Sequence, residues 1–142
     1  IRRKGAAMTL TKTTALGDIT VNDSVIAKAI IRSVQTARNK VFLSNQQGRL
    51  LGSHSRVSSG DMLDNHIIEE KDEKYRITFY VVLSFGTSIK NVTQTVLDAL
   101  EKEMSAMFPE YGGELIMKIV GIKSKNIAPR DIEVKREYGT AR

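Results

Sequence analysis

The segment from Tyr75 to Phe85 constrains the fold of this chain more than any other part of the sequence. Its side chains alternate, with Tyr75, Ile77, Phe79, Val81, Leu83 and Phe85 on one face and Arg76, Thr78, Tyr80, Val82 and Ser84 on the other. A two-residue period of this kind is typical of a β-strand with one buried face. We therefore predict a long strand whose apolar face, including Phe85, belongs to the core. Among its aromatic residues we expect Tyr80 alone to point the other way.

A helix is predicted directly after this strand. Gly86–Ser88 breaks the strand, and Ser88 is the expected helix N-cap. Apolar residues then recur at intervals of three and four, as on the buried side of a helix: Ile89, Val92, Val96, Leu100, Met104 and Met107. Pro109 and Gly112–Gly113 should end the helix, and the apolar run Leu115–Ile122 should form the next strand.

Shorter elements are predicted before the long strand. Gly17–Val21 is rich in β-branched residues and reads as a strand. It leads into a helix of about four turns with an apolar stripe: Val25, Ile26, Ala29, Ile30, Val34 and Ala37. Lys40–Ser44 either adds a strand or closes this helix. His66–Glu70 and the polar turn Lys71–Lys74 should form a hairpin with the long strand.

These elements give an α+β fold of order β-α-(β)-β-β-α-β. The simplest arrangement packs two helices on one face of a small, mostly antiparallel sheet. We expect a single α+β domain over residues 17–125, with a mobile loop at residues 45–64 where turn-forming residues are frequent. Residues 1–16 are expected to be a mobile N-terminal segment, and residues 126–142 an extended tail or a short edge strand. Because Met8 would suit a natural start, residues 1–7 are interpreted as non-native.

The composition excludes several classes of protein. The 142 residues contain no cysteine, which excludes disulfide scaffolds, cysteine-based zinc sites and thiol nucleophiles. No apolar run approaches the roughly 20 residues that cross a bilayer, so we expect no direct membrane span.

The net charge of +6 is distributed unevenly along the chain. Residues 1–60 contain ten basic and two acidic residues. Residues 61–100 contain four basic and seven acidic residues, and residues 101–142 contain eight basic and seven acidic residues. This asymmetry favours a face for an anionic partner, for which the candidates are Lys28, Arg32 and Arg38 on the first helix. A solvated surface whose two halves attract each other explains the same distribution.

A search for catalytic and metal-binding residues finds no recognisable arrangement. His54 and His66 have no second ligand at the spacing of a metal site, and each is expected to be solvated. The loop serines lack the rigid turn of a serine nucleophile: Ser53, Ser55, Ser58 and Ser59. Two clusters of acidic residues are interpreted as solvated surface. They are Glu69, Glu70, Asp72 and Glu73 at the hairpin, and Glu101 and Glu103 on the second helix. We therefore expect no enzymatic activity, no metal and no cofactor.

Several segments together resemble the alkaline-shock protein family, the general-stress envelope proteins of Gram-positive bacteria. The family's strand, glycine and polar step before a long helix are matched by Ile77–Ile89. Its opening is matched by Gly17–Val21 and Val25–Ala27, and its closing strand by Ile119–Ile122. The elements occur in the family's order throughout.

This resemblance implies a non-enzymatic, cytoplasmic, self-associating protein with a role in envelope or general stress tolerance. Some members lie against the inner face of the membrane, held there by a membrane-anchored partner protein, and the family supplies no catalytic residues. Homo-oligomers are also expected from candidate edge strands at Gly17–Val21 and Ile132–Lys135. The alternative hypothesis is a small RNA- or DNA-binding module that uses Lys28, Arg32 and Arg38.

Overall fold

The computed structural model describes the chain apart from residues 1, 5–8, 15–16, 38, 53–64, 72–73, 110–111 and 140–142. Its elements are β1 Arg2–Lys4, β2 Thr9–Thr14, β3 Gly17–Asn22, α1 Asp23–Gln35, β4 Val41–Ser44, β5 His66–Lys71, β6 Lys74–Ser84, α3 Ile89–Met107, β7 Gly112–Lys123 and β8 Ile127–Tyr138. The predicted order of helices and strands is present within this series.

The main sheet has the strand order β1-β5-β6-β7-β8, with β4 pairing along the same edge of β6 as β5. The pairs formed by β4, β5 and β8 are antiparallel, whereas β6 and β7 are parallel. A parallel pair requires a crossover connection, and α3 supplies it. The α+β class and the mostly antiparallel sheet are thus confirmed.

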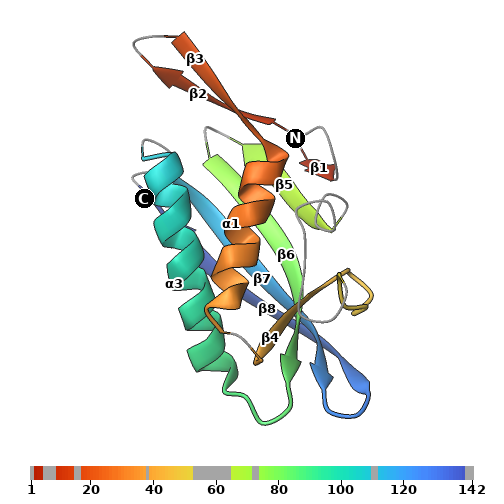
Figure 1. Ribbon diagram of the computed structural model, residues 1–142. Coiled ribbons are helices and arrows are strands. Elements are labelled where there is room, and N and C mark those ends of the chain that lie inside the picture. The colour runs from red at the N-terminus through yellow and green to blue at the C-terminus, as the bar shows by residue number, and fades with distance from the viewer. Residues whose placement is uncertain are drawn as a thin grey trace.

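Both helices cover the same face of this sheet, as Figure 1 shows. Beneath them lies one apolar cluster, to which both helices and strands β4 to β8 contribute. The apolar stripe of α3 and the apolar face of β6 are part of it: Val92, Val96 and Leu100 of α3 and Phe79, Val81 and Leu83 of β6 are all buried in this cluster. The helical stripe from Val92 to Met104 and the inner face of the strand therefore lie in one core. The prediction that Ile89 belongs to the buried stripe is wrong, because this first residue of α3 is 37% exposed.

Local sequence explains the ends of α3 and the hairpin before β6. The Asn91 N–H donates a hydrogen bond to the Ser88 Oγ at 3.3 Å, which confirms Ser88 as the N-cap. Lys71 and Lys74 form the last pair of the β5–β6 hairpin, at the predicted turn. Lys40–Ser44 resolves into strand β4.

The N-terminal part differs from the expected arrangement. β3 forms at the predicted position, but among the described strands its one partner is β2, in a separate two-stranded sheet. Figure 1 shows this hairpin projecting beyond the main sheet. Strands β1 and β2 lie in the segment that was expected to be mobile, and the threonines of β2 favour a strand because they are β-branched. Most of the expected mobile loop, residues 53–64, lies outside the described residues.

The prediction that Phe85 belongs to the core is wrong. β6 ends at Ser84, and Phe85 lies in the following turn with 76% of its surface exposed. Gly86 has a φ of 83°, which reverses the chain here. The alternation in the sequence therefore continues one residue beyond the strand that it describes.

Candidate interaction surfaces

The residues that bear chemistry do not assemble into a catalytic site in the described part of the chain. His54 and the four loop serines lie outside the described residues. His66 is 1% exposed, so the prediction of a solvated side chain is wrong. Its partner across the hairpin is Phe79, which lies on the buried face. No group of three His, Asp or Glu side chains that could hold a metal ion occurs within the described ranges.

The basic face of α1 is partly neutralised by α3. Lys28 is exposed. The Arg32 guanidinium, however, contacts the Glu103 Oε1 through both Nη2, at 2.7 Å, and Nε, at 2.8 Å. Arg38 lies outside the described residues. The structure therefore places one free basic side chain and one ion-paired side chain of this candidate set on the helix.

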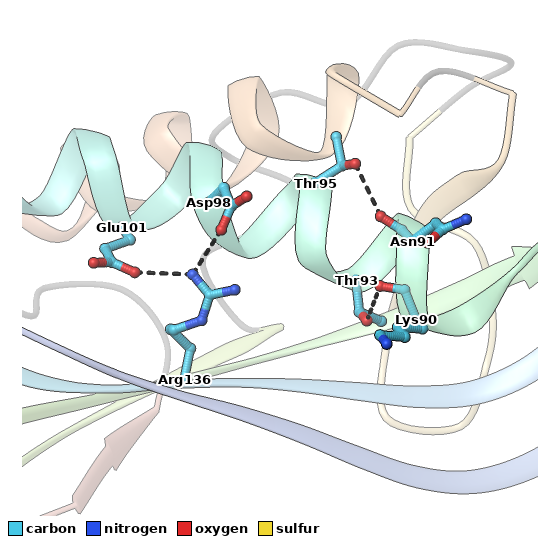
Figure 2. Close-up of polar contacts among 7 residues, drawn as sticks. All are labelled: Lys90, Asn91, Thr93, Thr95, Asp98, Glu101 and Arg136. Carbon is cyan, nitrogen blue, oxygen red and sulfur yellow. Dashed lines mark hydrogen bonds and ion pairs between the residues drawn. The ribbon is translucent and has the colours of Figure 1, made fainter.

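A second ion-pair cluster joins α3 to the last strand. The Arg136 Nη1 of β8 lies 2.8 Å from Asp98 Oδ1 and 2.9 Å from Glu101 Oε1, as drawn in Figure 2. The hydrogen bond to Glu101 raises the pKa of Arg136 above its ordinary value, with a further contribution from Asp98. Glu101 and Glu103, interpreted from the sequence as solvated, instead connect α3 to β8 and α1. No local signal identifies these partners, because both lie far along the chain.

The face of the sheet opposite the helices is here called the outer face. Part of it consists of buried side chains, and part of it carries charged side chains. Thr78, Tyr80 and Val82 lie on it, and each is buried. Tyr80 therefore points away from the core as predicted but is only 3% exposed. A base cannot stack on an aromatic ring that is covered. Beside these residues, the charged side chains on the outer face pair across strands, with Arg76 Nε 2.9 Å from Glu114 Oε1.

β8 is an edge strand of the main sheet. β8 pairs with β7 over its whole length, and no other described strand pairs with it. The predicted edge segment Ile132–Lys135 lies in the middle of this strand. Ile132 and Val134 face the helices and are partly buried, whereas Glu133 and Lys135 are exposed.

Charges along β8 alternate with these apolar residues. Glu133 Oε2 lies 3.4 Å from Lys135 Nζ on the same face of the strand. Lys118 Nζ of β7 lies 3.5 Å from Glu133 Oε1. A lone edge strand with closely spaced opposite charges resists unspecific pairing, but it can pair with a strand of complementary pattern.

Comparison with known proteins finds no matching family model, no matching curated protein and no matching solved structure. Neither α1 nor α3 contains an apolar stretch that is long enough to span a membrane, and this holds for the described residues as a whole.

Proposed function

We propose that this protein is a self-associating structural or interaction protein whose copies pair through the outer edge of β8. The observation that carries the proposal is the open edge of this twelve-residue strand at one side of the main sheet. Unpaired N–H and C=O groups along an edge form the template for pairing with another chain. A second copy supplies an identical edge, and a two-fold axis makes such a contact self-complementary.

The side-chain pattern favours one register of antiparallel pairing. If Val134 lies on the two-fold axis, Val134 faces its own copy, and Glu133 of each protomer faces Lys135 of the other. Each opposite-charge pair directly across two strands contributes about 0.2–1 kcal/mol. Shifting the axis by one residue, to Glu133 or Lys135, places like charges opposite each other. The apolar sides of Ile132 and Val134 also gain cover in this arrangement.

The biological role that accompanies this proposal is envelope or general stress tolerance in the manner of the alkaline-shock protein family, without catalysis. It is supported by the matching of Ile77–Ile89, Gly17–Val21 and Ile119–Ile122 to that family's pattern. Attachment to a membrane-anchored partner protein and a cytoplasmic location belong to the same proposal.

The alternative, an RNA- or DNA-binding module, has less support. Its basic helix offers Lys28, but the charge of Arg32 is paired with Glu103. Tyr80, the one aromatic of the long strand that points away from the core, is covered. Binding through phosphates depends on unpaired basic side chains, and it weakens steeply with salt.

Light scattering on the purified protein across a concentration series tests the self-association. We expect a concentration-dependent dimer. Glu133→Lys and Lys135→Glu each place like charges across the two-fold axis twice, and each should weaken the dimer about tenfold. The double variant carrying both changes restores opposite charges and should restore the affinity.

Lys74→Glu is the matched control for Lys135→Glu, because it makes the same charge reversal at an exposed position at the start of β6. It should leave the dimer unchanged. A wild-type protein that stays monomeric at every concentration overturns the self-association. A dimer whose affinity is the same in the wild type and in both single charge-reversal variants overturns the role of β8.

A further inference from the structure

One end of the molecule exposes apolar side chains that no described contact covers. At the lower end of the view in Figure 1 lie the β6–α3 connection, the β7–β8 turn and the start of β4. From residue 25 onward, the large exposed apolar residues whose exposure the structure describes are all found here: Phe85 at 76%, Ile89 at 37% and Ile127 at 36%. Clustered exposed apolar residues mark an interaction site, whereas isolated ones do not.

Backbone contacts hold these segments together. The Phe85 N–H donates a hydrogen bond to the Lys123 carbonyl at 2.8 Å, and Ile127 pairs with Lys123 across the β7–β8 hairpin. The Ser84 N–H donates to the Lys40 carbonyl at 2.9 Å. The three segments therefore form one surface, here called the basic end.

The charges of the basic end are nearly all positive. Residues 39–42, 84–91 and 122–131 contain five basic side chains and one acidic one: Lys40, Lys90, Lys123, Lys125 and Arg130, against Asp131. No ion pair between described residues involves any of the five. Lys123 Nζ lies over the Phe42 ring, 5.0 Å from its centroid, a cation–π contact that leaves its charge available.

The first turn of α3 adds to this positive potential. It contains no acidic residue, although an acidic side chain there would be favourable beside the positive end of the helix dipole. It carries the exposed Lys90 instead. A basic side chain at this end of a helix lowers the stability of the helix, and such locally unfavourable residues are expected at binding sites.

We propose that the basic end docks directly on an anionic lipid surface, with Phe85, Ile89 and Ile127 entering the interface and the surrounding lysines contacting lipid phosphates. Peripheral membrane binding combines buried apolar area with attraction to anionic headgroups. Lysine side chains suit this geometry because their stems lie along apolar surface while the ammonium group reaches the phosphates. Exposed isoleucine and phenylalanine side chains at the same end of the molecule fit a lipid phase better than a nucleic acid, which offers bases for stacking and phosphates for charge.

The absence of tryptophan from the sequence provides a direct probe. In Phe85→Trp, the single indole should shift its emission to shorter wavelength when vesicles of phosphatidylglycerol and phosphatidylcholine are added to the full chain. Vesicles of phosphatidylcholine alone should produce no shift. The matched control is Lys102→Trp, an exposed position far along α3 from the basic end, whose emission should not change with either vesicle.

Sedimentation with the same vesicles gives the affinity. Phe85→Ser should weaken partitioning at least about tenfold, because a phenylalanine side chain no longer leaves water. Lys125→Gln should weaken it about fivefold, and Lys102→Gln should have no effect. All three residues are exposed, so unchanged thermal unfolding should confirm that the variants fold.

Three results overturn the proposal. They are a wild-type protein that does not sediment with anionic vesicles, a Phe85→Ser variant that binds as tightly as wild type, and an indole at position 85 that stays in water. Binding to a mixed oligonucleotide that Lys125→Gln weakens and Phe85→Ser does not would assign the basic end to nucleic acid instead. The charge-reversed β8 variants should still bind vesicles, which separates this proposal from the self-association.

Discussion

Arg136 of β8 places its guanidinium 2.9 Å from the Glu101 carboxylate of α3, and it contacts Asp98 one turn earlier with the same nitrogen. The edge strand is thus tied to the helix that covers the core by a side chain with two acidic partners. Arg32 makes the corresponding contact from α1 to Glu103 on the other flank of α3. Ion pairs of this type hold α3 between its neighbours.

We expect Arg136→Gln to lower the free energy of unfolding by about 1 kcal/mol, at the upper end of the range for accessible ion pairs. Arg32→Gln should cost less, because Arg32 has one acidic partner and its side chain is 54% exposed. Urea melts of both variants provide the comparison. High salt should reduce the difference between Arg136→Gln and the wild type. The reverse ranking of the two variants would contradict the importance given to the two-partner contact.

Because Tyr138 is buried, we expect the free energy of unfolding to fall at alkaline pH. Burial raises the pKa of its hydroxyl from 10.0 to about 12, with a smaller contribution from Tyr75. Because the folded pKa is the higher one, the stabilisation is complete below pH 10 and is lost as the pH rises through about 12. The full effect on the free energy of unfolding is about 2–3 kcal/mol. Unfolding followed from pH 8 to pH 12 should reveal it.

Tyr138→Phe is the matched variant for this titration. Among the described residues the Tyr138 hydroxyl has no hydrogen-bond partner, so its removal leaves no other group unsatisfied. Near neutral pH the variant should be as stable as the wild type or more stable, and its stability should fall less between pH 10 and 12. A clear loss of stability at neutral pH would indicate that the hydroxyl has a partner after all.

Gly113 and Gly86 should respond differently to alanine. A Cβ at Gly113 of β7 would collide with the backbone of Tyr75 in the adjacent strand β6. We expect Gly113→Ala to cost about 3 kcal/mol or more, at the upper end for overpacked interiors, because the colliding atoms are backbone and cannot move aside easily. A Cβ at Gly86 meets nothing within 4 Å, so Gly86→Ala should cost only about 1–2 kcal/mol for its positive φ. Thermal unfolding of the two variants gives the comparison, and equal costs would contradict the close approach of the strands at Gly113.

The sequence predicted those features that depend on neighbouring residues in the chain. The strand alternation of β6 and the stripe of α3 follow from a local period, so the strand, the helix and their mutual burial could be predicted. The burial of a side chain by residues on a neighbouring strand could not be predicted in this way. His66 is covered because it pairs with Phe79, and its own neighbours in sequence give no sign of this.

The candidate surfaces show the same division. Lys28 and Arg32 could be placed on one side of α1 from their spacing, but Glu103, which pairs with Arg32, lies on another helix. The basic end combines segments from three separate parts of the chain, so no stretch of sequence displays it. The two-residue period places Phe85 in the core, although the strand ends at Ser84 and Phe85 lies in the turn that Gly86 completes.

The packing of α3 on β6 gives the last prediction. Leu100 is fully buried in the cluster that joins α3 to β6. Leu100→Ala should lower the free energy of unfolding by about 2–5 kcal/mol, because transfer energy is lost and a cavity remains. That is a large share of the roughly 5–15 kcal/mol available to a domain. Lys28→Ala, on the exposed side of α1, should change it by less than about 0.5 kcal/mol. Urea melts in which both substitutions were equally harmless would contradict the way in which the helices face the sheet.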